Sequence, residues 1–309
     1  MRGALLLVAA CIGSGGCARE PAEGEAAAEP AAAAILPDTG ATPAVAPELS
    51  ADDRHGDSLI VADRLARARA QHLDTLPIGA LVAALGRTFV GTPYVPRTLD
   101  PPGPERLVVN LRAMDCVTFI ENVLALARTL RTGGGFPEFT RELQRIRYRS
   151  GRIAGYPSRL HYFSEWITSN DEKGIVTDVT RELGGVIDAE SIGFMSANRS
   201  AYRQLEDDSV LAEIRAMEQR LATRVRYFVP ESRIGAVADR IAEGDIIAAT
   251  STLPGLDIAH TGIAVRQGGA LHLMHAPLVG DSVEISAAPL AERIIRIERQ
   301  DGIMVARPR

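Results

Sequence analysis

The sequence predicts an α+β protein with an antiparallel β-sheet. Its first half carries apolar residues at helical spacing. Its last third carries short segments rich in β-branched and apolar residues, separated by Gly, Pro or Asp, which is typical of strands. Because the helical segments come first and the strands later, we expect a helical half packed on an antiparallel sheet.

The helical segments follow one another in chain order. Leu59, Ala62, Leu65 and Ala66 fall on one face of the first, and Pro77 ends it. A run of three glycines, residues 133–135, ends the third helix. The predicted helices are residues 52–76, 78–90, 116–132, 137–150 and 208–223. The predicted strands are residues 246–251, 260–265, 270–276, 282–286 and 302–308.

Residues 1–17 have the pattern of an export segment. Arg2 precedes a short apolar run, and small residues follow it. Cys17 stands where a bacterial lipoprotein would be cleaved and lipidated, and Cys11 is the other cysteine in this region. Plain cleavage near Gly16 with release is the alternative. We therefore expect an exported protein of the cell envelope or periplasm, whose contact with a membrane is a lipid anchor.

Residues 18–50 are rich in Ala, Pro and Glu and have few large apolar side chains. Such a segment buries too little surface to offset the entropy of the chain, so it is predicted to be a disordered tether. Residues 51–309 then form a single domain. The net charge of -5 and the pI of about 5.8 give no electrostatic support to nucleic-acid binding.

Cys116 is the one cysteine after residue 50, so a disulfide within the domain is excluded. Asp115 is a good N-cap and places Cys116 in the first turn of a helix. The N–H groups and the positive end of the helix dipole would lower the pKa of the thiol and could hold an oxyanion. This stretch alone is equally consistent with a small buried core residue.

A thiol nucleophile needs a base, and the base needs an orienting group. His260 and His275 lie on two strands joined through residues 267–269. A turn at Gln267-Gly268 places the two histidines directly opposite each other, and a turn at Gly268-Gly269 makes them diagonal neighbours on one face. His272 falls on the opposite face in either register. The pair could be a base with its orienter, two metal ligands completed by Cys116, or a structural pair.

Four motifs, in order, resemble the NlpC-type papain-like cysteine hydrolases of bacterial cell walls. They are GTPY at 91–94, MDCVTFIENV at 114–123, HTGIAV at 260–265 and LMHAP at 273–277. The Asp-Cys-Val-Thr-Phe variant, His161-Tyr162-Phe163 with Trp166, and the run at 300–303 are closer to the N-acetylmuramoyl-L-alanine amidase-like branch. Val117 and Thr118 depart from the commoner Ser-Gly, which weakens any transfer of peptidase specificity. The resemblance covers residues 78–308.

The resemblance implies a papain-like fold, with the catalytic cysteine at a helix N-terminus packed on an antiparallel sheet or half-barrel. Cys116 would be the nucleophile, His260 the base and acid, and His275 its orienter. Tyr94 would lie beside the thiol near the oxyanion, and Asp115 would be a cap with a share in the site. The bond cut would be the amide between N-acetylmuramic acid, in its 1,6-anhydro form, and L-alanine. No cofactor or metal is implied.

Residues 155–205 lie between nucleophile and base and are far longer than a loop needs to be. We expect this insertion to wall the cleft and bind the muropeptide; a packed subdomain with a core Trp is the alternative. Its predicted substrate-binding residues are His161, Tyr162, Trp166, Asn170 and Arg199, with Tyr202 beside them. Arg145, Arg147 and Arg149 could meet a peptide carboxylate or form a solvated helix face.

Three functions remain open at this stage. The first is a thiol amidase acting on peptidoglycan fragments, the expected partners. The second is a stem-peptide endopeptidase or an acyl transferase with the same Cys116 and His260. The third is a non-catalytic wall-binding lipoprotein, which would require a broken triad.

Overall fold

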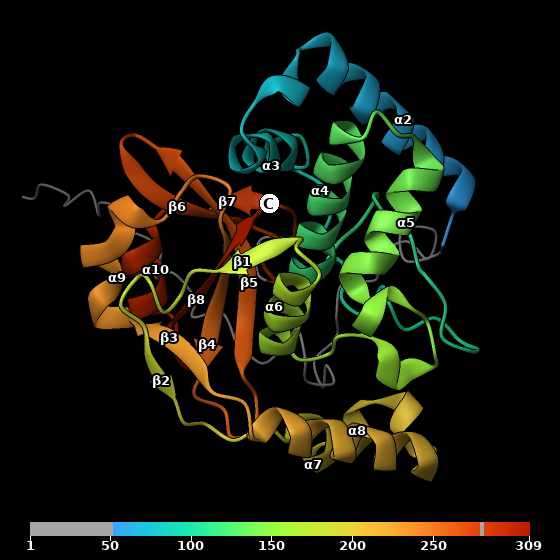
Figure 1. Ribbon diagram of the computed structural model, residues 1–309, viewed down its shortest axis with the longest axis vertical. Coiled ribbons are helices and arrows are strands. Elements are labelled where there is room, and N and C mark those ends of the chain that lie inside the picture. Colours follow the sequence, from blue (N-terminus) through green and yellow to red (C-terminus); the bar gives the residue numbers. More distant parts are fainter. Residues whose placement is uncertain (1–51, 279–280) are drawn as a thin grey trace, which may run out of the picture.

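The computed structural model describes residues 52–278 and 281–309. The predicted export segment, the tether and Cys17 lie outside the described residues. Helices and strands pack as expected for an α+β protein, with one antiparallel sheet covered on both faces (Figure 1). No helix in these two ranges combines the length and apolar character needed to cross a membrane.

The five predicted helices agree with the structure within a few residues, except that the first is shorter than predicted. It ends at Ala70, and a short 3-10 turn follows in which His72 has a φ of 54°. The helices at 163–172, 194–197, 231–237 and 290–296 were not predicted. The helices are α2 (Arg54–Ala70), α3 (Ile78–Arg87), α4 (Cys116–Arg131), α5 (Phe136–Arg147), α6 (Phe163–Glu172), α7 (Phe194–Ala197), α8 (Asp208–Ala222), α9 (Glu231–Val237) and α10 (Leu290–Arg296).

All strand pairs are antiparallel, in the order β2-β3-β8-β4-β5-β6-β7, and β1 also pairs with β8. The strands are β1 (Val176–Asp178), β2 (Val186–Asp188), β3 (Arg226–Pro230), β4 (Ile246–Ser251), β5 (Ile258–Gln267), β6 (Ala270–His275), β7 (Glu284–Ile285) and β8 (Gln300–Pro308). The first three were not predicted, because β1 and β2 have three residues each, too few to show alternation.

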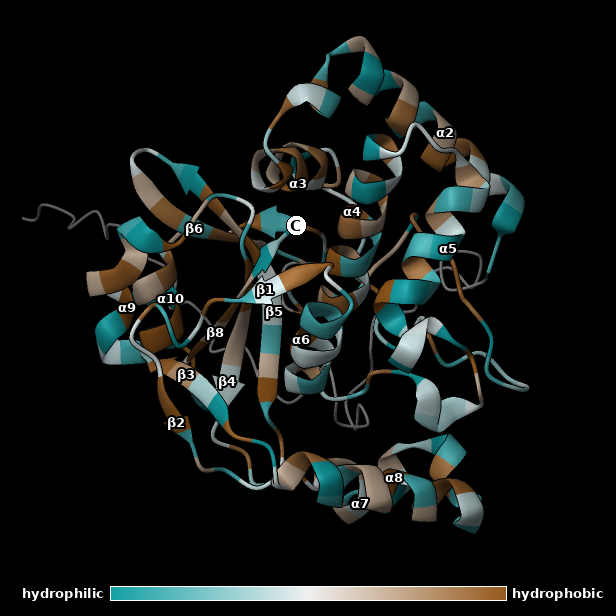
Figure 2. Cartoon of the chain, in the orientation of Figure 1, coloured by the Kyte–Doolittle hydropathy of each residue, from teal (hydrophilic) through white to brown (hydrophobic). Residues whose placement is uncertain are grey.

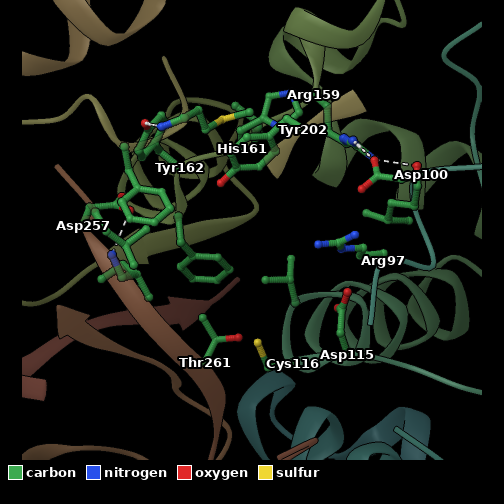
Figure 3. Close-up of a pocket in the computed structure, with 18 of the residues that line it drawn as sticks. Arg97, Asp100, Asp115, Cys116, Arg159, His161, Tyr162, Tyr202, Asp257 and Thr261 are labelled. Carbon is green, nitrogen blue, oxygen red and sulfur yellow. Dashed lines mark hydrogen bonds and ion pairs between the residues drawn. The ribbon is translucent and has the colours of Figure 1, made fainter. Parts of the chain in front are cut away.

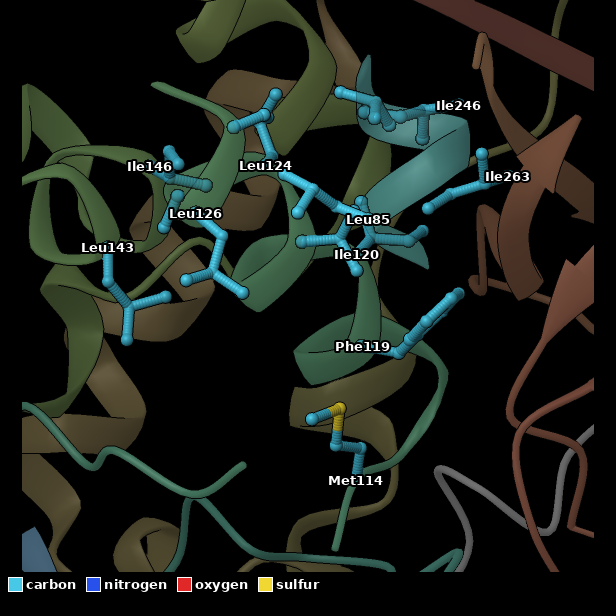
Figure 4. Close-up of a cluster of buried hydrophobic side chains, with 14 of the residues drawn as sticks. Leu85, Met114, Phe119, Ile120, Leu124, Leu126, Leu143, Ile146, Ile246 and Ile263 are labelled. Carbon is cyan, nitrogen blue, oxygen red and sulfur yellow. The ribbon is translucent and has the colours of Figure 1, made fainter. Parts of the chain in front are cut away.

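The sheet is buried on both faces, and its strands show the two-residue period this requires. Ile246 and Ala248 of β4 face the large core formed with α2 to α6, whereas Ile247 and Ala249 face a second core under α9 and α10. Figure 2 shows apolar and polar residues alternating along the helices. Figure 4 shows the large core, in which α4 is buried on most sides.

A third core lies under α7 and α8, at the end of the sheet where residues 256–257 lead into β5. It contains Tyr156, Tyr162 and Phe194 from the insertion, together with Leu256. The insertion is therefore packed as a subdomain, and it also borders the cavity described next.

Candidate active site

Cys116 is the first residue of α4 and is buried. Asp115 caps this helix in a reciprocal arrangement: its carboxylate accepts from the Thr118 N–H at 2.8 Å, and its own N–H donates to the Thr118 hydroxyl at 2.9 Å. Burial raises the pKa of Asp115, and the two hydrogen bonds from Thr118 oppose that rise. The cap fixes where the helix begins, so the thiol sits among the unpaired N–H groups of the first turn.

His260 on β5 and His275 on β6 are both buried and meet edge to face, with Nε2 of His260 2.8 Å from Nδ1 of His275. Strand pairing puts Gln267 opposite Ala270, so the turn is Gly268-Gly269, both with positive φ. The diagonal arrangement is therefore the correct one, and the directly opposite register is wrong. His272 lies on the other face of β6, bonded to the Ser286 carbonyl.

Both imidazoles are held neutral. Burial lowers the pKa of His260 well below its ordinary value, with a smaller contribution from the nearby Arg293. Burial likewise lowers the pKa of His275, and His260 and Arg293 add to the effect. A neutral imidazole has one nitrogen that accepts a proton, which a general base requires.

The GTPY segment joins the helix that carries the thiol to the strands that carry the histidines. Gly91 and Thr92 exchange backbone hydrogen bonds with Val283, just before β7. Tyr94 forms a bridge with Met114, two residues before Cys116. Tyr94 is buried and does not line the cavity, so its predicted place beside the oxyanion remains a prediction.

A cavity of about 370 Å³ opens over Cys116 and His260 (Figure 3). Asp115, Val117 and Thr261 form its floor around the thiol. The cavity thus places the thiol and the imidazole of His260 on one enclosed surface. Four segments supply the remaining walls: residues 97–100, 156–163, 194–204 and 256–259.

The walls differ in chemistry. One is charged: Arg97, Asp100 and Arg159 lie together on the side above Asp115 (Figure 3). Arg159 is buried, donates to Asp100 at 2.6 Å and lies over the ring of Tyr156. The other wall is largely apolar and contains Phe163, Phe194, Met195, Leu256 and Ile258.

Of the predicted substrate-binding residues, Asp115 and, from the insertion, His161 and Tyr162 line this cavity, and Tyr202 lines it as well. His161 bonds through Nε2 to the Tyr156 carbonyl at 2.9 Å, and burial lowers its pKa, with Arg159 adding to the effect. The hydroxyl of Tyr162 is already used in the fold: it donates to Glu218 at 2.7 Å and accepts from the Met195 N–H. Tyr162 therefore offers its ring rather than its hydroxyl to the cavity.

The other three predicted binding residues do not line the cavity. Trp166 is fully buried, stacks on Phe163 and donates to Glu121 at 3.2 Å. Asn170 is buried and donates to the carbonyls of Ile146 and Trp166. Arg199 is occupied by the carbonyls of residues 205 and 206 and by the carboxylate of Asp208. These side chains stabilise the insertion itself.

The arginines at the end of α5 do not form a solvated face. Arg147 is buried, borders the cavity and is paired with Glu121 at 2.6 Å. Arg149 forms a two-pronged pair with Glu165. Arg145 bonds the Lys173 carbonyl at 2.6 Å. Arg147 is therefore buried, whereas Arg145 and Arg149 are partly exposed while each bonds a neighbouring segment.

Sequence reasoning missed several cavity residues, including Arg97, Asp100, Arg159 and Asp257. Asp257 accepts from the Ser164 N–H at 2.7 Å and so caps α6 from a distant segment. Only Arg97 carries a local signal: it follows Val95-Pro96 in a turn-rich stretch, and its φ is 58°. Within the described residues, no group of three His, Cys, Asp or Glu side chains is placed to hold a metal.

Comparisons with known proteins show the family of the chain. The family model described as N-acetylmuramoyl-L-alanine amidase-like matches residues 84–303. An N-acetylmuramoyl-L-alanine amidase from Bacteroides uniformis is 36% identical, with a TM-score of 0.72 over 75% of this chain and 99% of that one. A Bacteroides fragilis protein named as a proposed xylanase is also 36% identical, with a TM-score of 0.68 over 72% of this chain and 98% of that one.

A Legionella pneumophila protein shares the fold at 16% identity, with a TM-score of 0.61 over 85% of this chain and 97% of that one. No match is found among curated proteins. The family match covers the segments that carry Cys116, His260 and His275. The chain belongs to the N-acetylmuramoyl-L-alanine amidase-like family.

Proposed function

We propose that this protein is a cysteine amidase that cuts the amide between N-acetylmuramic acid, in its 1,6-anhydro form, and L-alanine in peptidoglycan fragments. The observation that carries the proposal is one cavity lined by a thiol at a helix N-terminus and by an imidazole that is bonded to a second imidazole. Family membership supplies the class of bond. The papain-like NlpC-type placement belongs to the same proposal.

The mechanism follows from the groups present. His260 accepts the proton of the Cys116 thiol, and the thiolate attacks the carbonyl of the lactyl amide. N–H groups in the first turn of α4 stabilise the oxyanion. His260 then gives the proton to the leaving nitrogen of L-alanine, and the amine departs. Water, deprotonated by His260, hydrolyses the thioester and releases the muramic acid carboxylate and the thiol.

The xylanase name of one relative suggests another chemistry, and the site favours amide cleavage over it. Glycosidic bond hydrolysis uses two carboxyl groups that flank the bond. The carboxylates that line this cavity each have a structural partner instead: Asp100 with Arg159, Asp115 with Thr118, Glu121 with Arg147 and Asp257 with Ser164.

The differing walls suit a substrate made of an uncharged sugar and a charged peptide. An anhydro-sugar has apolar ring faces, which suit the wall around Phe163 and Phe194. A stem peptide carries carboxylates, which suit the wall with Arg97 and Arg159. Because peptidoglycan lies outside the cytoplasm, this function also fits the export segment and the lipid anchor at Cys17 expected from the sequence. The mass of the mature chain tests both the removal of the export segment and the lipidation of Cys17.

The experiment that tests the proposal incubates the chain from about residue 50 onward with a defined anhydro-muropeptide, beside a Cys116→Ala variant. We expect free anhydro-sugar and an intact peptide that begins with L-alanine, and we expect both to be lost in the variant. A cut within the peptide would make the protein an endopeptidase. No cut by either protein, with the fragment bound, would leave a wall-binding protein.

A further inference from the structure

Glu284 on β7 lies next to His275, the member of the histidine pair that does not line the cavity. In the pairing of β6 with β7, His275 and Glu284 are direct partners, so their side chains share a face of the sheet. The Oε1 atom of Glu284 is 3.8 Å from Nε2 of His275. The carboxylate is about half exposed, whereas the imidazole is buried.

The positions of the protons on the two histidines suggest a role for Glu284. This inference rests on the proposed function, in which Cys116 is the nucleophile and His260 the base. His260 contacts His275 through Nε2, so Nδ1 is the nitrogen left to accept the thiol proton. A neutral His260 with an unprotonated Nδ1 carries its proton on Nε2. Nε2 donates that proton in a hydrogen bond to Nδ1 of His275, so Nδ1 of His275 must be unprotonated. His275, also neutral, then carries its own proton on Nε2, the nitrogen nearest Glu284.

We propose that Glu284 is a positioning residue for the reaction, which holds His275 in the tautomer with its proton on Nε2 and thereby keeps Nδ1 of His260 basic toward the thiol. At 3.8 Å the contact is an ion-pair distance and is too long for a hydrogen bond, so Glu284 acts through its charge. A negative carboxylate that can accept but not donate favours the tautomer that turns an N–H toward it. In the opposite tautomer, His275 carries its proton on Nδ1 and donates it to Nε2 of His260. The proton of His260 then sits on Nδ1, which can no longer accept the proton of the thiol.

The site also favours this carboxylate electrostatically. Arg293 on α10 is a cation whose field disfavours protonation of both imidazoles. When His260 takes the thiol proton, an imidazolium forms in buried surroundings. Glu284 on β7, whose carboxylate lies 3.8 Å from Nε2 of His275, would offset that charge through the pair. Thus Glu284 on β7 and Arg293 on α10 are charged groups of opposite sign that act on the histidine pair.

The test compares Glu284→Ala and Glu284→Gln with the unmodified protein in amide cleavage of the anhydro-muropeptide. We expect Glu284→Ala to lower kcat about tenfold while KM stays constant, because the base is in the wrong tautomer part of the time. Glu284→Gln keeps the shape of the side chain but removes the charge, so it should show most of the same loss. Glu292→Ala, an exposed glutamate paired with Arg296 on α10, is the matched control and should leave kcat unchanged.

A spectroscopic readout separates positioning from a structural role. Long-range ¹H–¹⁵N spectra of the imidazoles should show the proton of His275 on Nε2 in the unmodified protein, and a mixture of tautomers in Glu284→Ala. Unchanged kcat in Glu284→Ala, or a proton on Nδ1 of His275 in the unmodified protein, would overturn the role of Glu284. Full cleavage by Cys116→Ala would instead overturn the proposed thiol mechanism, so the two failures are distinguishable.

Discussion

At the scale of single residues, burial decides the protonation of the candidate base. His260 lines the cavity and His275 does not, but both are buried, and burial is the largest influence on the pKa of each. Their lowered pKa values keep the pair neutral well below the pH at which an exposed histidine is protonated. The base is therefore ready to accept a proton over a wide range of pH.

This gives a prediction for the pH dependence of cleavage. Protonation of His260 would remove the base, and its lowered pKa moves that loss to lower pH. We expect kcat/KM for the anhydro-muropeptide to hold its plateau as pH falls through about 6.5, the ordinary histidine pKa, and to decline only further below. A decline already centred at or above that pH would contradict the assignment of a buried neutral His260 as base.

At the scale of elements, the start of α4 depends on a few side chains. The cap between Asp115 and Thr118 satisfies two backbone donors and holds the first turn where the thiol is needed. The sequence made this predictable, since Asp before an apolar helical run is a strong start signal. The position of the helix in the fold, buried by α3, α5 and the sheet, could be expected from its two apolar faces.

Removing the cap should cost stability. Thr118→Val keeps the shape of the side chain and removes the hydroxyl that bonds Asp115. We expect the free energy of unfolding to fall by about 1 kcal/mol, measured by urea denaturation. Thr140→Val on α5, where the hydroxyl is exposed and bonds the Pro137 carbonyl, should change it by less than about 0.5 kcal/mol. Equal effects of the two changes would show that the cap contributes nothing specific.

The hairpin of β5 and β6 requires a small residue at position 262. A Cβ on Gly262, two residues after His260, would lie 2.6 Å from the Leu273 side chain and 2.8 Å from the Met274 carbonyl. We expect Gly262→Ala to lower the free energy of unfolding by about 1–3 kcal/mol through overpacking. Gly235→Ala on α9, where the space is open, should instead be neutral or stabilise by up to about 1 kcal/mol. Chemical denaturation of both variants measures the contrast.

At the scale of the whole molecule, a buried polar network links the helices below the cavity. Glu121 on α4 is paired with Arg147 at the end of α5 and accepts from Trp166 on α6. Burial raises the pKa of Glu121, and the charge of Arg147 opposes that rise. Arg147 also donates to the Val108 carbonyl at 2.6 Å, so the network as a whole joins four segments of the chain.

Removing one partner of this network should lower the free energy of unfolding. Arg147→Met leaves the Glu121 carboxylate buried without its partner, and we expect the free energy of unfolding to fall by about 3–5 kcal/mol. Adding Glu121→Gln should recover part of that loss, since the buried charge is gone. Arg67→Met, which removes an exposed pair with Asp63, is the control and should cost less than about 0.5 kcal/mol. Additive effects at 121 and 147 in urea denaturation would contradict the coupling.

The sequence indicated the parts of the site that rest on local rules, and it missed those that rest on distant contacts. Asp115 marks a helix start, and two glycines after Gln267 make a hairpin that brings two histidines together. By contrast, Trp166 and Arg199 look like ligand-binding residues in the sequence, and only tertiary contacts show that they support the fold. Arg159 and Asp257 were missed for the same reason, since their partners lie about 60 and 93 residues away.

The most direct test of the central claim is to trap the covalent intermediate. The protein is mixed with an anhydro-muropeptide, quenched in acid within the first turnovers and analysed by intact and peptide mass spectrometry. The account predicts an adduct with the mass of the anhydro-muramoyl group, located on the peptide that contains Cys116 and missing in Cys116→Ala. An adduct that carries amino acids of the stem peptide, or cleavage that persists in Cys116→Ala, would contradict it.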